Sequence, residues 1–393
     1  SLVVCRGLDS SAMVALVERV LGAGRDRINP AAYGTTGFPL AFGMAGTAIG
    51  VPPAGERPGD TLYAGFIEKL RGGDAATARI YLDRWSDAVR GDANAAALYA
   101  LHSAELALLW DNPDEASTAV DRVLAGGEGV SREVFKKAEA LKAYLLLYRG
   151  MIDDAAVIIA RNREAGAVEY SALAFAYGIA RGSAYDEEIP VKALAGSGLL
   201  LHPDRLRLLI AEYLFLAGRE SEARGVVAGI GAGTPFSPRE ACKIAMLGGG
   251  TGGLKITEGR AAGILALFRE SDGDRIRARA VPLMEEGGRF DRLSPFPLAA
   301  AMKAYSQSER FSSVHALLGT TDLDRIAAAA FWMDLLPVFM RMYELNRAER
   351  RYGDALTVLG TIGASAGKVR IPAVRASYEY ALGTELLRAS RFH

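Results

Sequence analysis

From about Thr61 onward, apolar and polar positions alternate with the period of a helix. Apolar residues recur three and four positions apart, and short runs of Gly, Asp, Asn and Pro interrupt them. Ala, Leu, Arg and Glu outnumber β-branched and aromatic residues, a balance that favours helix over strand. The pattern predicts an all-α chain of consecutive amphipathic helices with no substantial sheet.

The interruptions form a repeat of their own. Each is a six-residue segment, and the segments are GDAATA (73–78), DNPDEA (111–116), GMIDDA (150–155), GSAYDE (182–187), GRESEA (218–223), GDRIRA (273–278), SERFSS (308–313) and RRYGDA (350–355). Their ends lie 32 to 42 residues apart, except for one spacing of 55. This period is typical of helical hairpins that stack on one another. We expect about eight such hairpins between Leu62 and Leu387.

Small residues recur before the turns. Ala143 and Ala211 each lie seven positions before a turn begins, where a small side chain lets two helices of a hairpin approach closely. A single hairpin leaves one apolar face uncovered, so neighbouring hairpins are expected to pack on it. An irregular helical domain is the alternative interpretation of the same pattern.

The turn pattern resembles the tetratricopeptide repeat (TPR), in which a Gly–acidic–x–x–Glu–Ala turn joins two antiparallel helices. LLIAEYLFLAGRESEARGVVAGI (208–230) matches it best, followed by ALKAYLLLYRGMIDDAAVIIA (140–160). The Trp and Pro common in that family are mostly absent, which leaves a related α-solenoid class open. The resemblance implies an α-solenoid superhelix of stacked antiparallel hairpins whose concave groove binds a peptide or partner protein.

In TPR-like units the first helix of each hairpin lines the groove. The offsets of its exposed positions from the turn select a set of candidate partner-binding residues in this chain: Glu105, Lys137, Tyr144, Tyr148, Arg205, Glu212, Phe215, Glu270, Tyr305, Glu344 and Arg347. Aromatic side chains supply contact area, and Arg and Glu can bind a peptide's backbone or its charged end. Tyr144, Tyr148, Arg205 and Glu212 are the strongest candidates because they belong to neighbouring, well-matched repeats.

Residues 1–60 do not fit the repeat. A helix is expected at 8–24, and the Gly- and Pro-rich remainder is interpreted as an irregular segment that caps the repeat array of 61–393. The apolar stretch Gly37–Pro53 is an alternative docking site for a partner or a membrane surface.

The array contains a Gly-rich insertion near 231–260, and the segment LGGGTGGLKITEGR (247–260) within it poses the question of phosphate binding. A P-loop needs a strand before the loop and Gly-Lys-Ser/Thr at its end. Here Leu254 precedes Lys255, Ile256 follows it, and the preceding segment has the pattern of a helix with Pro238 in its first turn. We interpret the glycine run as an inter-repeat loop that binds no nucleotide.

Composition narrows the function further. Acidic and basic residues balance at 46 each, which points to no nucleic-acid partner. Two cysteines and four scattered histidines offer no metal-site spacing, and no apolar run is long enough for a transmembrane span. LVVC at residues 2–5 is weakly similar to the end of a bacterial lipoprotein signal, so a cytoplasmic and a cell-envelope location both remain open.

Together these features predict a non-catalytic scaffold that binds a protein or peptide and needs no cofactor. Two other functions remain open. One is a hydrolase acting on a carbohydrate and built on an α/α-toroid, which would need two carboxylates converging in one cleft. The other is a helical sensor for a small ligand.

Overall fold

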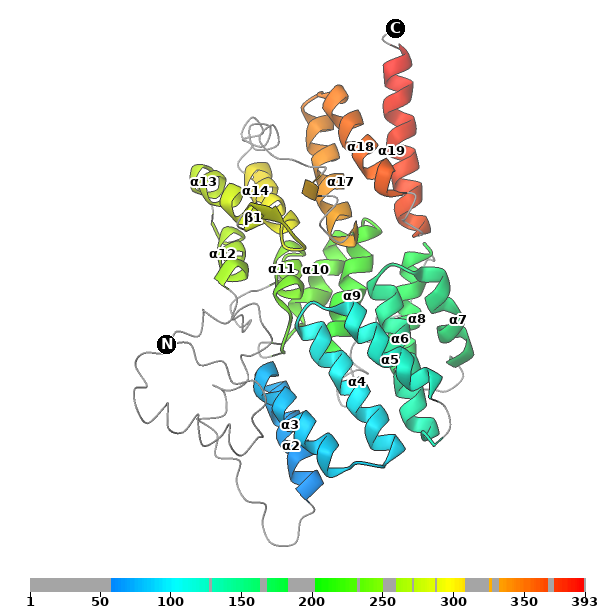
Figure 1. Cartoon of the computed structure of the whole chain (residues 1–393). Coiled ribbons are helices and arrows are strands. Elements are labelled where there is room, and N and C mark those ends of the chain that lie inside the picture. The colour runs from blue at the N-terminus through cyan, green and yellow to red at the C-terminus, as the bar shows by residue number, and fades with distance from the viewer. Residues whose placement is uncertain are drawn as a thin grey trace, which may run out of the picture.

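The computed structural model in Figure 1 describes most of the chain beyond residue 57. The described residues are 58–126, 129–162, 168–182, 202–231, 234–249, 259–270, 272–286, 288–307, 325–326, 332–366 and 371–391. The expected N-terminal helix, the capping segment, Gly37–Pro53 and the LVVC segment lie outside them, as does Lys255.

The described part of the chain is all-α, as its pattern of apolar positions predicts. Its helices are α2 (Pro58–Arg71), α3 (Ala75–Ala88), α4 (Ala93–Leu109), α5 (Pro113–Ala125), α6 (Arg132–Tyr148), α7 (Ile152–Asn162), α8 (Val168–Ala180), α9 (Pro203–Leu216), α10 (Glu220–Ala228), α11 (Pro238–Met246), α12 (Gly259–Leu267), α13 (Gly273–Met284), α14 (Pro295–Gln307), α17 (Trp332–Ala348), α18 (Tyr352–Ala366) and α19 (Pro372–Arg391). Strands β1 (Glu285–Glu286) and β2 (Arg289–Phe290) form one short antiparallel pair.

Five helix pairs are joined by the same three-residue turn: α2 to α3, α4 to α5, α6 to α7, α9 to α10 and α17 to α18. In each, the middle turn residue has a positive φ, and the last turn residue donates its N–H to the carbonyl five positions earlier over 2.8–3.0 Å. This is the hydrogen bond of a Schellman helix end. The middle residues are Gly73, Asp111, Gly150, Gly218 and Arg350, and each is the first residue of a predicted turn segment.

The long spacing of 55 residues contains a further turn. Gly248 has φ 91°, and the Gly249 N–H donates to the Ile244 carbonyl over 2.9 Å, so the glycine run starts as a helix end. Both residues lie beyond the last residue of α11, so they belong to the connection between helices, and residues 250–258 lie outside the described residues. The segment before it is helix α11 with Pro238 in the first turn, as predicted.

Two other predicted turn segments differ from the five. Gly273 begins helix α13, whose first turn Asp272 caps through its side chain, so GDRIRA marks a helix start. Gly182 has the expected positive φ, whereas the rest of GSAYDE and all of SERFSS lie outside the described residues.

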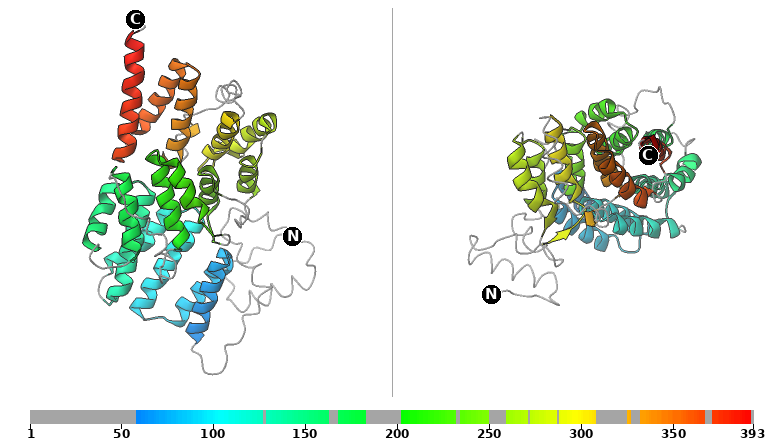
Figure 2. Two further views of the ribbon diagram at one scale, coloured as in Figure 1. Left: turned by 180° about the vertical axis from the view of Figure 1, so that it is seen from behind. Right: turned by 90° about the horizontal axis from the view of Figure 1, so that it is seen from above.

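Most consecutive helices pack against one another along the described chain, and further contacts join helices far apart in sequence. Helix α17 packs on α9, and α19 packs on α8. Figure 2 shows α17, α18 and α19 stacked onto one end of the helices that run from α4 to α10. Ala143 and Ala211 are both fully buried, as expected for helix-contact positions. Within the described residues, no helix is both long and apolar enough to cross a membrane.

Candidate functional site

The four strongest groove candidates meet in one place, but they are not exposed. Tyr144 and Tyr148 on α6 and Arg205 and Glu212 on α9 each have at most 4% of their surface accessible. All four lie where α6 and α9 face α11. The expectation that they face an open groove is wrong, because α11 and α17 cover them.

Helix α11 brings three charged side chains to this face. Ser237 and Glu240 form a reciprocal capping box, and Pro238 starts the helix, so the local sequence sets its first turn. Arg239 and Lys243 follow at helical spacing and are buried to within 2% of their surface. We call the following residues the polar cluster: Tyr144, Tyr148, Arg205, Glu212, Arg239, Glu240, Lys243 and Asp334.

Ion pairs link the polar cluster across three helices. Arg239 contacts both carboxylate oxygens of Asp334 on α17, with Nη2 and Oδ1 3.0 Å apart. Lys243 Nζ lies 2.9 Å from Asp334 Oδ1 and 2.6 Å from Glu212 Oε1 on α9. Each pair is almost completely removed from water, so loss of one member would leave a buried charge without compensation.

A fourth ion pair, between Arg205 on α9 and Glu240 on α11, completes the polar cluster. Arg205 Nη2 donates to Glu240 Oε2 over 3.2 Å, and the Ser237 N–H donates to the same oxygen over 2.9 Å. Glu240 Oε1, by contrast, has no hydrogen-bond partner. Within the described residues, Oε2 therefore accepts both of the hydrogen bonds that stabilise this carboxylate.

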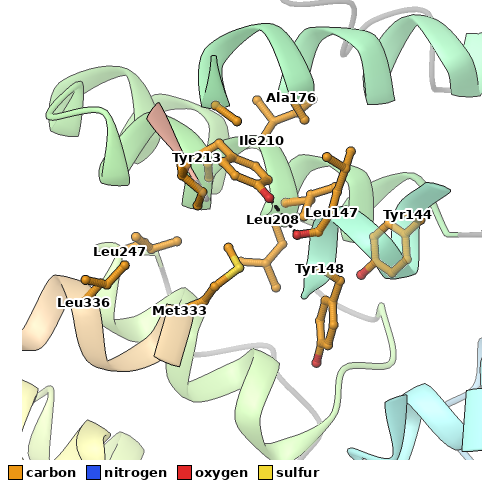
Figure 3. Packing of buried hydrophobic residues seen from close by; sticks show 14 of the residues in the cluster. Tyr144, Leu147, Tyr148, Ala176, Leu208, Ile210, Tyr213, Leu247, Met333 and Leu336 are labelled. Atoms are coloured by element: carbon orange, nitrogen blue, oxygen red, sulfur yellow. Dashed lines mark hydrogen bonds between the residues drawn. The ribbon is translucent and has the colours of Figure 1, made fainter. Parts of the chain in front are cut away.

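The ring of Tyr148 faces two of the cations. The Arg239 guanidinium lies 4.8 Å from the ring centre of Tyr148, and Lys243 Nζ lies 5.7 Å from the same ring. Figure 3 shows Tyr144 and Tyr148 beside an apolar layer that includes Leu208 and Met333. Burial away from water raises the pKa of both tyrosine hydroxyls well above the ordinary value.

Asp111 connects the α4–α5 turn to α11. Its Oδ1 accepts a hydrogen bond from the Ser237 hydroxyl at 2.6 Å, and its Oδ2 accepts one from the Arg239 N–H at 3.1 Å. The carboxylate therefore sits at the N-terminus of α11, where the helix dipole favours a negative charge. The Arg292 side chain also contacts the Asp111 carbonyl.

Burial and charge compete at the carboxyl groups. Burial raises the pKa of Glu212 and of Asp111 above their ordinary values, although Lys243 and Arg239 respectively oppose it. Burial would also raise the pKa of Asp334, but Arg239 and Lys243 outweigh it and hold that pKa below its ordinary value. Arg239 and Lys243 thus favour the charged form of Asp334, whereas burial favours the protonated form of Glu212 and of Asp111.

The remaining groove candidates are scattered. Glu105 is buried, with Oε2 2.7 Å from His102 Nδ1, and His102 Nε2 lies 2.9 Å from the Tyr63 hydroxyl. Lys137 is half-buried and forms an ion pair with Glu133.

The structure places the other candidates on α9, α14 and α17 and just beyond the end of α12. Phe215 is half-buried against the core, and Glu270 accepts a hydrogen bond from the Asp272 N–H. Glu344 is exposed and pairs with Arg341, and Arg347 is half-buried beside Glu385. The side chain of Tyr305 lies outside the described residues.

Asp111, Arg239, Glu240, Lys243 and Asp334 were not among the sequence candidates. Two signals in the sequence point to three of them, Asp334, Arg239 and Lys243. Asp334 is a single acid within the apolar run FWMDLLPVF, and Arg239 and Lys243 lie four apart on a capped helix. A charge surrounded by apolar residues in a helix is buried only when it is paired.

The arrangement favours a structural role for the polar cluster. Each of its carboxylates contacts a cation, and the described residues hold no group of three or more His, Cys, Asp or Glu side chains arranged to bind a metal ion. Comparisons with protein-family models, with curated proteins and with solved structures found no match.

Proposed function

We propose that this chain is a TPR-like helical-repeat scaffold that binds a protein or peptide partner without catalysing a reaction. The observation that carries the proposal is the recurrence of one turn geometry in five helical hairpins, with the same positive-φ position and the same backbone hydrogen bond. Hairpins that repeat in this way build extended surfaces suited to binding. The inference from repeated hairpins to partner binding rests on analogy with such scaffolds.

The buried polar cluster supports this assignment. Its ion pairs join α9, α11 and α17, and the paired residues Arg239 and Asp334 are 95 positions apart in sequence. A scaffold needs its hairpins in one fixed arrangement, and paired buried charges penalise every arrangement that separates them. The hydrolase alternative would use carboxylates accessible to a sugar, and the acids of the polar cluster are instead paired and buried.

The binding surface that we assign keeps three members of the original groove set. Lys137, Phe215 and Glu344 keep accessible surface in the groove register, and they come from α6, α9 and α17. Phe215 offers an apolar contact. Lys137 and Glu344 can pair with charges on a bound segment and so set the direction in which it binds.

The test is a binding assay with a partner first identified by affinity capture and then purified. Calorimetry would compare the unmodified chain with a triple variant, Lys137→Ala, Phe215→Ala and Glu344→Ala. A control variant carries Asp154→Ala and Val157→Ala, which alter exposed side chains on α7 outside the register. We expect the triple variant to lose about tenfold or more in affinity, and the control to lose none.

Two results would overturn the proposal. One is equal affinity of the triple variant and the unmodified chain for the partner. The other is turnover of a carbohydrate substrate that persists through purification and disappears in a variant of an acidic residue. Circular dichroism must show the same helical signal for every variant, so that a loss of binding reflects the surface and not unfolding.

A further inference from the structure

Three side chains on α2 and α4 form a hydrogen-bonded chain outside the polar cluster. The Tyr63 hydroxyl and His102 Nε2 are 2.9 Å apart, and His102 Nδ1 and Glu105 Oε2 are 2.7 Å apart. His102 and Glu105 are three positions apart on α4, so they lie on the same side of that helix. A hydroxyl, an imidazole and a carboxylate linked in this order are the arrangement that activates a hydroxyl nucleophile.

The chemistry of the three groups sets the direction of the two hydrogen bonds. A carboxylate only accepts, so Glu105 accepts the proton that a neutral His102 carries on Nδ1. Nε2 of the same imidazole then has a lone pair and accepts the hydrogen bond of the Tyr63 hydroxyl. His102 is therefore oriented as a general base for the Tyr63 proton.

Aromatic packing holds the base and the hydroxyl in place. The His102 ring packs edge to face against Phe66 with ring centres 4.8 Å apart, and the Tyr63 ring centre lies 5.1 Å from that of Trp85. His102 and Glu105 are buried, whereas Tyr63 is half-buried and keeps part of its surface accessible. A reagent in solvent therefore meets Tyr63, and the base lies behind it.

Tyr63 keeps its proton at neutral pH. Burial, followed by the charge of Glu105, raises the pKa of its hydroxyl above the ordinary value. A protonated phenol is a weak nucleophile, and it reacts when a neighbouring base removes the proton during the attack. His102 Nε2 lies at the distance that such a proton transfer requires.

We propose that Tyr63 is a covalent modification site that takes the acyl group of an activated ester, with His102 as the general base. The Tyr63 oxygen attacks the carbonyl carbon, a new C–O bond forms, and the C–O bond to the leaving alcohol breaks. The Tyr63 proton passes to His102 Nε2 and from there to the leaving oxygen. Glu105 positions the imidazole and stabilises the imidazolium that forms during the transfer.

The modification is independent of the partner binding proposed above. It is a single transfer to the chain and not a catalytic turnover. Its three residues are also separate from the assigned binding surface of Lys137, Phe215 and Glu344.

The test uses p-nitrophenyl acetate as the activated ester, and peptide mass spectrometry measures the acetylation rate of each tyrosine in the full chain. We expect Tyr63 to react about tenfold or more faster than Tyr99 and Tyr380. Tyr99 is also half-buried, but its hydroxyl donates to the carboxylate of Asp83 and not to an imidazole. Tyr380 is 74% exposed and gives the rate of an accessible tyrosine.

Two substitutions separate activation from accessibility. His102→Phe keeps an aromatic ring beside Phe66 and removes the base, so it should slow acetylation of Tyr63 by about 100-fold or more. Glu105→Gln keeps the shape of the side chain and removes its charge, and it should slow the reaction by a smaller factor. The Tyr99 rate should stay the same in both variants, which shows that the fold is intact.

Two results would overturn the proposal. One is a Tyr63 rate in the unmodified chain no faster than the rates of Tyr99 and Tyr380, a comparison that needs no variant to fold. The other is a Tyr63 rate that His102→Phe leaves unchanged while the Tyr99 rate is also unchanged. The hydrogen-bonded chain would then be a structural contact only.

Discussion

Arg239 and Asp334 lie 95 residues apart in sequence and form a two-contact ion pair in the interior, with Nη2 and Oδ1 3.0 Å apart. Asp334 is completely inaccessible and Arg239 is 2% accessible. The pair joins α11 to α17, and Lys243 extends it to Glu212 on α9. Three helices are thereby tied together by charges that have no access to water.

Replacing Asp334 by Ala should strongly destabilise the chain. The substitution leaves Arg239 and Lys243 buried without their shared carboxylate, and the expected loss in unfolding free energy is about 3–5 kcal/mol. Urea unfolding followed by circular dichroism measures it. Glu344→Ala, at an exposed acid on the same helix, should change stability by less than about 0.5 kcal/mol. A similar small change for Asp334→Ala would show that the pair is not buried in solution.

Asp111 should make stability depend on pH. Burial raises its folded-state pKa above the unfolded value of about 4, so the folded state binds the proton more tightly. The stability that this provides is present below that unfolded value and is lost as pH rises through the raised folded value. In Asp111→Asn, the amide keeps an acceptor for the Arg239 N–H and the conformational tolerance for positive φ.

The measurement is the difference in melting temperature between Asp111→Asn and the unmodified chain at pH 4 and pH 7. We expect the melting temperature of Asp111→Asn, relative to that of the unmodified chain, to be higher at pH 7 than at pH 4. Glu212 titrates in the same direction in both proteins, so taking the difference cancels its contribution. A difference that stays constant between the two pH values contradicts a raised pKa at Asp111.

Gly249 should tolerate no side chain. A Cβ there would lie 2.3 Å from Val227 Cγ1 and 2.6 Å from Ile244 Cγ2, so Gly249→Ala is expected to cost about 1–3 kcal/mol through overpacking. Gly225 lies in α10 with nothing within 4 Å of its Cβ position. Gly225→Ala should therefore stabilise the chain by about 0.4–1 kcal/mol. Thermal unfolding of both variants distinguishes these opposite signs.

Ala143 and Ala211 should resist enlargement. Both are fully buried between helices, so Ala143→Leu and Ala211→Leu are each expected to cost about 1–3 kcal/mol. Ala160→Leu, at an exposed position of α7, is the control for the intrinsic effect of Leu in a helix. Equal melting temperatures for all three variants would contradict the helix packing described here.

The helices and their turns follow from local chemistry. Apolar spacing of three and four residues produces amphipathic helices, and Gly73, Gly150 and Gly218 adopt the positive φ that ends a helix at little cost. Local rules also give the start of α11, because Ser237, Pro238 and Glu240 form its cap within four residues. A sequence read in short windows therefore predicts the all-α class and the period of its hairpins.

Burial of the groove candidates was decided by tertiary structure. Periodicity groups Tyr148 and Glu212 on one side of neighbouring helices, but it carries no information about which later segment covers that side. The covering residues Arg239 and Asp334 are far away in sequence, and their placement depends on contacts that form only once the chain has folded back.

Asp111 shows the same division at a single residue. Its turn has the geometry of the glycine turns, and local rules favour Gly at a positive φ. The aspartate is explained only by its contacts with Ser237 and Arg239, which lie 126 and 128 residues further along the chain. Local chemistry determined where this chain turns. Contacts between residues far apart in sequence determined that the turn at Asp111 has a carboxylate where other turns have Gly.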